Sequence, residues 1–330
     1  MLWAINLRRR EMVRIVEPFV EIYPLDRLED IKKHIEKCGR TCYKSEDKIT
    51  DTSAEQFVEG ILKSGHESVI EHANLIFKVK NGSENLNKVQ EMASKVRGLY
   101  YHLTETELLL VGNMRTFRDI SRLGYNDFDV WFCQNGLDVF ANREGQIRFL
   151  IGELTLEGVQ YLNKNDDRDD LNNITVHMIT NLSCYKDITR HRLASFSIES
   201  TRFCNYSKGK YGSELTILKP VNLEKDSPEY NEWLLCMQDA EKHYMKMCEL
   251  GCRADQSRLC LPHSIKADVI MTANAREWKH IFNLRCDKAA HPDVRKVMLA
   301  ALDLFHREGY ATFNDLYNKF LPDIEEFKEK

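Results

Sequence analysis

The sequence lacks the glycine-rich signatures by which many proteins hold a nucleotide. None of its 15 glycines falls in a Gly-x-Gly-x-x-Gly turn or in a Walker phosphate loop. A bound dinucleotide would therefore be held by arginines and polar side chains and not by a Rossmann turn. Arginine suits that task, because its planar guanidinium grips phosphate with two parallel hydrogen bonds and stacks on flat rings.

Cysteine pairs of the kind that bind zinc are also missing. The chain has 10 cysteines but no Cys-x-x-Cys pair. Cys38/Cys42 and Cys248/Cys252 have helical spacing, without partner histidines in register. We therefore predict reduced thiols, no metal site and a cytoplasmic protein.

Long apolar runs and a strong net charge are absent as well. No run approaches the length of a membrane span, and the apolar start of residues 1–11 is shorter than a signal-peptide core. We treat residues 1–11 as an N-terminal extension, with Met12 as an alternative start. The net charge of −4 gives no overall attraction to nucleic acid or to membranes, so we expect neither as a partner. Any anion site must then be a local basic cluster.

The composition that is present indicates a soluble globular protein of 330 residues, with 43% hydrophobic and 30% charged residues. Its patterns predict an α/β fold, with a mixed sheet and long flanking helices. Predicted strands cover residues 13–23, 73–79, 108–111 and 174–180. Predicted helices cover residues 26–38, 84–101, 186–193 and 228–251.

Three local signals refine these boundaries. Pro18 interrupts the first predicted strand, which places that strand at a sheet edge. The first predicted helix is expected to end near Gly39. Ser53 and Gln56 form a capping box that opens another helix, which Gly65 should terminate.

Basic residues cluster in residues 190–203, Arg-His-Arg-Leu-Ala-Ser-Phe-Ser-Ile-Glu-Ser-Thr-Arg-Phe. Arg190 and Arg192 cannot both lie in the core without anionic partners. On a helix, consecutive side chains diverge by about 100°, so this triplet suits a position between two ligands. A solvated basic helix face is the alternative, but Leu193 and Phe196 interleave the charges instead of leaving one polar stripe.

Two further segments carry polar side chains at ordered spacings. Residues 66–72 read His-Glu-Ser-Val-Ile-Glu-His. The two histidines stand six apart and do not share a helix face, which excludes a zinc-protease helix and leaves a polar turn as the structural alternative. Residues 274–285 read Asn-Ala-Arg-Glu-Trp-Lys-His-Ile-Phe-Asn-Leu-Arg, for which an amphipathic helix is the alternative.

The start of this last segment repeats an earlier one. Asn-x-Arg-x-Phe-Arg-x-Ile at residues 113–120 returns as Asn-x-Arg-x-Trp-Lys-x-Ile at residues 274–281. The repeat is either chance or a sign that a second pair, Asn113 and Arg115, lies near the same or a neighbouring site.

Together these segments resemble the flavin-dependent thymidylate synthase (ThyX) family. Arg-His-Arg followed after seven residues by Ser200, the His-Glu-Ser-x-x-Glu-His run, and Asn-x-Arg followed by Asn-Leu-Arg stand in the family's order. Arg258, before Leu-Cys-Leu-Pro, is similar to the family's Arg-x-x-Leu-Pro. The resemblance covers residues 12–80 and 174–300. It implies one ThyX-like α/β catalytic domain, reaching from residue 12 to residue 330, with an insertion of open role at about residues 81–173.

The resemblance implies the reductive methylation of dUMP to dTMP. Methylenetetrahydrofolate would donate the carbon, FAD would carry the hydride and NADPH would reduce the flavin. The family's sites are assembled between subunits, so a homotetramer is expected, although the internal repeat leaves room for a dimer that mimics one. Two alternatives stay open. One is a divergent flavoenzyme acting on another pyrimidine nucleotide. The other is a nonenzymatic protein that binds nucleotides or nucleic acid through its arginines, which the net charge disfavours.

Site residues follow from the resemblance position by position. The residues expected to bind FAD are Ser68, Glu71, Arg190, His191, Arg192, Asn274, Ala275, Arg276 and His280. The residues expected around the nucleotide are Asp187, Arg190, Ile198, Ser200, Thr201, Arg202, Arg258 and Arg285.

Arg285 and Ser200 are the candidate catalytic residues. A guanidinium aimed at the pyrimidine N3/carbonyl edge favours the anionic ring and activates it toward electrophilic carbon. Serine needs an adjacent base to act as a nucleophile, and no Ser-His-Asp arrangement is evident, so Ser200 is read mainly as a positioning group. His191 is either a proton shuttle or a packed structural histidine.

Some positions depart from the usual family motif. Ser197 and Ile198 stand where Asn and Glu are usual, with Glu199 one position later. Phe203 lacks a tyrosine hydroxyl, and Asp187 replaces Gln or Glu. These departures bear on the nucleotide substrate more than on the flavin.

Overall fold

The computed structural model describes residues 13–142, 154–160, 162, 164, 166, 168–209 and 213–329. Strands within this part of the chain form two four-stranded sheets and one two-stranded pair. The expected extension, residues 1–11, lies outside the described residues. Among the described residues, no helix is both long and apolar enough to cross a membrane.

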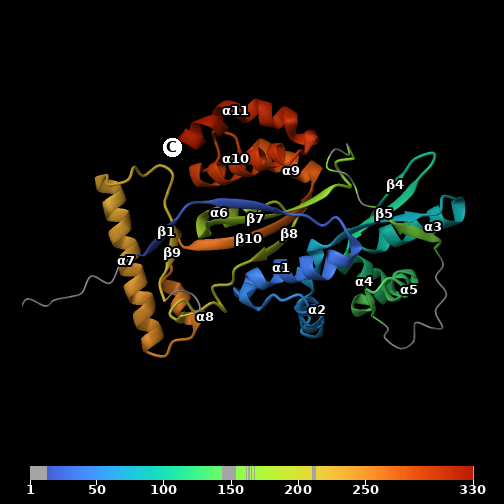
Figure 1. Cartoon of the computed structure of the whole chain (residues 1–330), viewed down its shortest axis with the longest axis horizontal. Coiled ribbons are helices and arrows are strands. Elements are labelled where there is room, and N and C mark those ends of the chain that lie inside the picture. Colours follow the sequence, from blue (N-terminus) through green and yellow to red (C-terminus); the bar gives the residue numbers. More distant parts are fainter. Residues whose placement is uncertain are drawn as a thin grey trace, which may run out of the picture.

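The first sheet lies in the middle of Figure 1 and runs in the order β2-β7-β10-β8, with every pair antiparallel. Helices α9, α10 and α11 cover one of its faces, and α1 lies on the other. The bounds are β2 (Phe19–Tyr23), β7 (Asn173–Asn181), β10 (Lys266–Asn274), β8 (Ser195–Ile198), α1 (Ile31–Tyr43), α6 (Leu182–Ile188), α9 (Ala275–Arg285), α10 (Pro292–Arg307) and α11 (Asn314–Glu329).

The second sheet, at the right of Figure 1, runs in the order β4-β5-β3-β6 and is also antiparallel throughout. Its core joins the α1 residues Ile31 and Ile35 to β3, β5, α3, α4 and α5. The bounds are α2 (Ser53–Lys63), β3 (Asn74–Val79), α3 (Ser83–Lys95), β4 (Tyr100–Leu103), β5 (Leu108–Asn113), α4 (Met114–Arg122), α5 (Asp127–Gln134) and β6 (Leu156–Val159).

A third, smaller core lies at the left of Figure 1. There β1 pairs with β9 in parallel, and both lie beside the long helix α7. The bounds are β1 (Arg14–Val16), β9 (Thr216–Leu218), α7 (Pro228–Glu249) and α8 (Ala254–Ser257).

The two large sheets repeat one arrangement. Read from the β6 and β2 edges, β6-β3-β5-β4 corresponds to β2-β7-β10-β8. The first residues of β3 and β7 are both asparagines that face the last residues of β5 and β10. Asn74 pairs with Asn113 in one sheet, and Asn173 pairs with Asn274 in the other.

The strand-to-helix junctions repeat with the same hydrogen bonds at the same distances. The first residue of α4, Met114, donates its backbone N–H to the Ala73 carbonyl at 2.8 Å, and Ala275 in α9 donates to Asn172 at 2.8 Å. The side chain of Asn113 caps α4, and that of Asn274 caps α9, each by accepting an N–H at 2.9 Å. The sequence repeat is therefore a structural repeat and not chance.

Most of the predicted elements are confirmed. The chain is α/β with long helices, the first strand breaks at Pro18 into β1 and β2, and β2 is a sheet edge. Ser227 caps α7 ahead of Pro228. The mixed sheet was wrong, because both large sheets are antiparallel and the four strands between residues 74 and 159 build a second sheet instead of extending the first.

Four local predictions were also wrong. The helix predicted over residues 84–101 ends at Lys95, and β4 begins at Tyr100. Helix α1 continues through Gly39 to Tyr43, because this glycine permits close packing. A Cβ there would lie 2.6 Å from the Phe57 ring and 2.7 Å from Val69. Ser53 makes no capping bond and instead donates its hydroxyl to Glu36 at 2.8 Å. The helix predicted over residues 186–193 ends at Ile188, so the Arg-His-Arg triplet lies in a turn before β8.

We predict that Gly39→Ala lowers the free energy of unfolding by about 1–3 kcal/mol, because the added methyl overlaps two packed side chains. The matched control is Gly60→Ala in α2, where a Cβ would meet no atom within 4 Å. That change should raise stability by about 0.5–1 kcal/mol through helix propensity. Urea unfolding of both variants measures the difference, and a Gly39→Ala variant as stable as the parent would contradict this packing.

Candidate active site

The predicted catalytic arginine is held in place by the turn that follows α6. Arg285, the last residue of α9, donates its Nε–H to His191 Nε2 at 3.1 Å. It also donates an Nη2–H to the carbonyl of Asp187 at 2.9 Å. Glu277 Oε1 lies 3.4 Å from the other ring nitrogen of His191. Arg285 is therefore oriented by two partners, while no described residue accepts from its Nη1.

His191 is neutral in this arrangement. Its side chain is buried, and burial followed by the charges of Arg285 and His280 lowers its pKa to about 4. Because Arg285 donates to Nε2, we place the ring proton on Nδ1, facing Glu277. Burial also raises the pKa of Glu277. Both ring nitrogens are thus engaged, which favours a positioning role for His191 over a free proton shuttle.

His191, Glu277 and His280 could each offer a metal ligand atom, since these atoms lie within 4.8 Å of one another. Two histidines and one carboxylate are a ligand set that can bind iron. Here, however, Arg285 donates to the Nε2 of His191, and its positive charge beside the same imidazole ring opposes a cation. We interpret the trio as a contact cluster, in which His191 lies 3.4 Å from the Glu277 carboxylate and its ring centroid lies 5.8 Å from that of His280.

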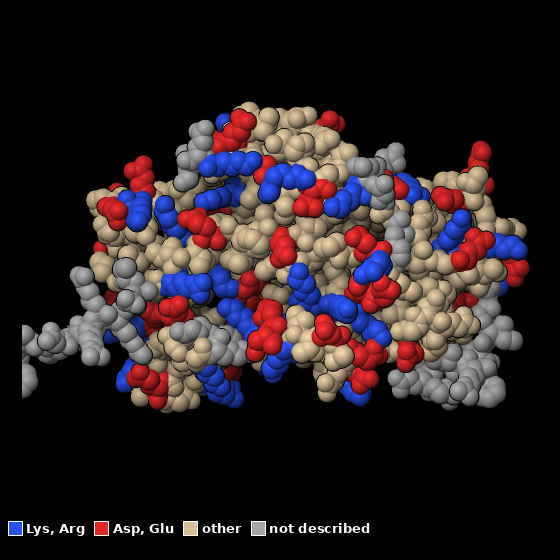
Figure 2. Space-filling model, in the orientation of Figure 1, with Lys and Arg blue, Asp and Glu red and all other residues tan. Residues whose placement is uncertain are grey.

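Three arginines near this cluster have no carboxylate partner. Arg190 and Arg192 flank His191, and Arg276 is the second residue of α9; all three side chains are exposed. Among the described residues, none offers any of them a carboxylate oxygen within 4.0 Å. By contrast, the α4 arginines Arg115 and Arg122 are both paired with acids. Figure 2 shows basic and acidic side chains interspersed over the face in view, without a continuous patch of one sign. Unpaired guanidinium groups in one place suit a phosphate ligand.

The N-terminus of α9 is fixed by Asn274. Its Oδ1 accepts from Glu277 N at 2.9 Å and its Nδ2 donates to the Asp170 carbonyl at 3.2 Å. Ala275 is buried behind it. The amide of Asn274 is therefore used in shaping the helix start, and Arg276 is the residue of this motif that faces solvent.

The segment of residues 66–72 forms a 3₁₀ turn against β8. Ser68 is exposed, whereas Glu71 accepts hydrogen bonds from Arg115 at 2.6 Å and from Ser195 Oγ at 3.2 Å. Arg115 is the counterpart of Arg276 in the structural repeat. Glu71 thus joins α4 to β8, the strand that follows the Arg-His-Arg turn.

His72 makes the second and more buried connection. Its Nδ1 lies 2.8 Å from Thr272 Oγ1 and its Nε2 lies 2.9 Å from Ser197 Oγ. The hydrogen bonds extend further, because Thr272 Oγ1 lies 2.7 Å from Thr175 Oγ1, and Thr175 Oγ1 lies 3.4 Å from His34 Nε2. Burial lowers the pKa of His72 to about 3 and that of His34 to about 4. A neutral imidazole has one donor and one acceptor, which two hydroxyls can satisfy.

Three of the expected nucleotide residues, Ser200, Thr201 and Arg202, lie at the other end of β8. Ser200 donates its backbone N–H to the Cys42 carbonyl at 3.0 Å, and Arg202 lies over the Phe203 ring at 5.4 Å. No described residue offers Ser200 Oγ a base, so positioning remains its supported role. Thr201 shares this turn, and Arg258 begins a separate exposed 3₁₀ turn.

Glu199 does not replace the glutamate missing at position 198. Its carboxylate accepts from Tyr206 at 2.6 Å and pairs with Lys44 at 3.1 Å and Lys266 at 3.0 Å. Its side chain is only 1% exposed. Ile198, one residue earlier, packs against the core of the first sheet.

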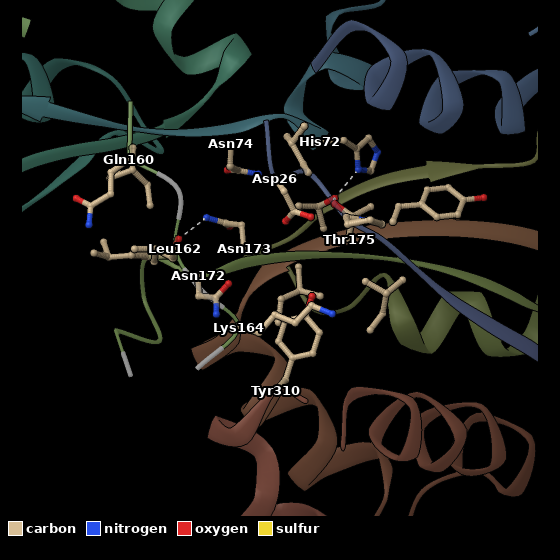
Figure 3. Close-up of a pocket in the computed structure, with 18 residues that line it drawn as sticks. Asp26, His72, Asn74, Gln160, Leu162, Lys164, Asn172, Asn173, Thr175 and Tyr310 are labelled. Atoms are coloured by element: carbon tan, nitrogen blue, oxygen red, sulfur yellow. Dashed lines mark hydrogen bonds between the residues drawn. The ribbon is translucent and has the colours of Figure 1, made fainter. Parts of the chain in front are cut away.

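Strand β8 separates the expected site residues into two groups. The four residues of β8 span roughly 10–13 Å and separate the Arg-His-Arg turn from the Ser200 turn. A cleft lies between the two large sheets, and none of the expected site residues lines it (Figure 3). Glu277 and Ser195 were missed as functional neighbours, whereas Arg115 was named as one alternative. For Arg115 the sequence repeat was a signal, but for Glu277 and Ser195 only the folded contacts reveal a role.

Comparison with known proteins adds a family match. A family model described as thymidylate synthase complementing protein matches residues 25–89 and 170–308, more than half of the chain. The matched parts include the turn of residues 66–72, the Arg-His-Arg turn and α9.

Individual relatives match over shorter stretches. The chain is 29% identical over 120 residues to the flavin-dependent thymidylate synthase of Pyrococcus abyssi, covering 36% of this chain and 48% of the relative. It is 32% identical to that of Pyrococcus horikoshii, covering 36% and 49%. The chain thus spans about half the length of the curated relatives it matches. A crystal structure of Helicobacter pylori ThyX with FAD and dUMP matches with a TM-score of 0.35 and 18% identity, covering 44% of this chain and 72% of that one.

The buried histidines predict acid sensitivity. His72 has a folded pKa of about 3, below the ordinary 6.5, so the unfolded chain binds a proton that the folded chain excludes. Its contribution is complete above about pH 6.5 and is lost as the pH falls toward 3. Each such histidine adds a slope of up to about 1.4 kcal/mol per pH unit. His72→Gln should flatten the slope of unfolding free energy between pH 6 and 4, measured by urea titration. His243→Gln, at an exposed position of α7, is the matched control, and an unchanged slope in His72→Gln would count against the buried neutral ring.

Removing the arginine charge should change the titration of His191. In Arg285→Ala we expect the pKa of His191 to rise from about 4, because one positive neighbour is gone, yet to stay below 6.5 because burial is the larger cause. NMR titration of the ring proton measures this. Arg276→Ala serves as the control and should leave the value in place. Equal pKa values in the parent and Arg285→Ala would show that the two side chains are not in contact.

Proposed function

Because the chain belongs to the thymidylate synthase complementing protein family, we propose that it is a flavin-dependent thymidylate synthase. The reaction is the reductive methylation of dUMP to dTMP, with methylenetetrahydrofolate as carbon donor, FAD as hydride carrier and NADPH as reductant. The names of the matched relatives support the activity. The observation that carries it is the cluster of unpaired arginines beside a fixed Arg285, at the positions that the family motif assigns to the site.

The donor set fits a flavin nucleotide. Arg190, Arg192 and Arg276 offer guanidinium groups without competing carboxylates, as a diphosphate requires. Ser68 and His280 are exposed and add a hydroxyl and an imidazole. When bound there, FAD would supply a hydride, which no amino-acid side chain provides. Asn274 and Ala275 contribute by fixing the start of α9 and not through a free polar group.

Arg285 is the residue proposed to activate the pyrimidine. His191 and the Asp187 carbonyl hold its guanidinium on two sides and leave Nη1 available. A fixed positive charge beside the ring's N3/carbonyl edge stabilises the anionic form. Because the charge is oriented before the substrate arrives, little reorganisation is needed during the reaction.

Ser200, Thr201, Arg202 and Arg258 are proposed to hold the nucleotide in a site completed by another copy of the chain. Their distance from Arg285 within one chain supports this, since β8 lies between the two groups. The resemblance implies a homotetramer. The structural repeat supports the alternative of a dimer, because each chain already carries two copies of the sheet arrangement.

The remaining assignments follow the same proposal. The segment at about residues 81–173 is proposed as an insertion in one catalytic domain, and it supplies most of the second sheet. All 10 cysteines of the chain are free thiols, which supports a cytoplasmic location.

A second candidate function has one observation in its favour. The carboxylate expected at position 198 is absent, and that of Glu199 is locked in a buried ion cluster. A flavoenzyme acting on another pyrimidine nucleotide, which does not use that carboxylate, would fit the same site.

Visible absorption of the purified, FAD-reconstituted protein tests both candidates. We expect a flavin band that shifts when dUMP is added, followed by dTMP formation with the folate and NADPH. Arg285→Ala should keep the flavin band but lose turnover by about 10²–10³-fold, in line with removal of one fixed charge. Arg253→Ala, whose side chain pairs with Asp255 on the surface, is the matched control. A band that ignores dUMP but responds to another pyrimidine nucleotide would favour the second candidate. A protein that takes up no FAD would refute both.

A further inference from the structure

Helix α4 lies outside the two stretches that the family model matches, residues 25–89 and 170–308. It nevertheless contacts the turn of residues 66–72, which is expected to bind the flavin. Arg115, near the start of α4, donates its Nη1–H to Glu71 at 2.6 Å. Arg122, at the end of α4, donates its Nη1–H to Glu67 at 2.9 Å and contacts the same carboxylate through Nη2. Both ends of the turn are therefore held by α4.

The two ion pairs run antiparallel between the helix and the turn. Arg115 and Arg122 stand seven residues apart on an α-helix, which rises by about 10 Å over that length. Glu67 and Glu71 stand four residues apart on a 3₁₀ turn, which rises by about 8 Å. These lengths are close enough for both pairs to form at once. Arg118, on the same face of α4, adds a third contact 3.4 Å from Glu67.

Between the two held glutamates lies Ser68, one of the residues expected to bind FAD. Its side chain is exposed, and no described residue offers its hydroxyl a hydrogen bond. The next two residues, Val69 and Ile70, are buried in the core. The place of the Ser68 hydroxyl is therefore set by core packing behind it and by the two glutamates beside it.

Each glutamate keeps a second partner when its α4 arginine is removed. Glu71 also accepts from Ser195 Oγ at 3.2 Å, and Glu67 also pairs with Arg118. The side chains of Glu71 and Arg115 are 26% and 45% exposed, and ion pairs at such positions contribute little to the stability of a fold. We therefore expect either arginine to be replaceable without unfolding the protein.

We propose that Arg115 and Arg122 are positioning residues of the flavin site. They hold the glutamates at both ends of the turn and thereby fix Ser68 where the cofactor binds. Carboxylates already neutralise both guanidinium groups, so these groups offer no free charge to the diphosphate, unlike Arg276 on α9. They act on the flavin through the turn. The inference rests on the proposed flavin-dependent function.

Fluorescence titration of the full-length protein with FAD tests the proposal. Arg115→Ala and Arg122→Ala should each raise the Kd for FAD about fivefold, and the double variant at least about tenfold. The midpoint of urea unfolding should stay close to that of the parent, which separates positioning from a general loss of stability. If the double variant does not fold, the two single variants carry the test, because each leaves one partner on its glutamate.

Conservative variants and a control sharpen the titration. Arg115→Lys should recover most of the loss, because an ammonium can replace the single bond to Glu71. Arg122→Lys should recover little, because an ammonium cannot reproduce a two-pronged contact. Lys95→Ala is the matched control, since it breaks an ion pair with Glu91 in the same segment at a similar exposure of 46%. It should bind FAD as the parent does.

Hydrogen–deuterium exchange of the protein without FAD gives a readout that does not involve the cofactor. In the double variant, the backbone amides of residues 66–69 should exchange at least about fivefold faster than in the parent, because both ends of the turn are released. The amides of α9 should exchange at the parent's rate.

Three results would overturn the proposal. The first is a double variant with the parent's Kd for FAD, and the second is unchanged exchange in the turn. The third is an equal loss in Lys95→Ala, which would show that any ion pair of this segment has the same effect. A parent protein that takes up no FAD would refute the proposed function and this inference together. That failure is recognised in the parent, whereas the other failures are recognised in the variants.

Discussion

The arrangement of the site depends on the buried bonds of His72 to Thr272 and Ser197. These bonds tie the turn of residues 66–72, which leads into β3 of the second sheet, to β10 and β8, two neighbouring strands of the first sheet. They fix β8 at the point where Glu71 contacts Ser195, and β8 in turn begins just after the Arg-His-Arg turn. Because the ring is buried and neutral, the connection adds no charge beneath an arginine-rich surface.

Charge pairing separates the two halves of the structural repeat. On α4, Arg115 is neutralised by Glu71 and Arg122 by Glu67, so this helix is committed to internal contacts. On α9, the counterpart residue Arg276 has no described carboxylate partner, and Arg285 is aimed by His191 instead of being neutralised. The same strand-to-helix junction thus serves folding in one repeat and ligand binding, as proposed, in the other.

The sequence predicted the elements that depend on local signals and failed where tertiary packing decided. Ser227 with Pro228, and the break at Pro18, act within a few residues, so their effects are visible in the sequence. Gly39 was misread as a helix end, since its role is to admit Phe57 and Val69 from distant segments. Most candidate residues could be named from motif spacing. Spacing does not reveal that the buried carboxylate of Glu199 forms ion pairs with Lys44 and Lys266. Nor does it reveal that two sheets, and not one, carry the strands.

The central claim is that the unpaired arginines and Arg285 form a nucleotide site completed between copies of the chain. A crystal structure of the assembled protein with FAD and dUMP tests it most directly. We expect the FAD diphosphate within hydrogen-bond distance of Arg190, Arg192 or Arg276, and the pyrimidine beside Arg285 of one copy while Ser200 of another copy contacts the nucleotide. Nucleotides bound elsewhere, with these arginines left in solvent, would contradict the account.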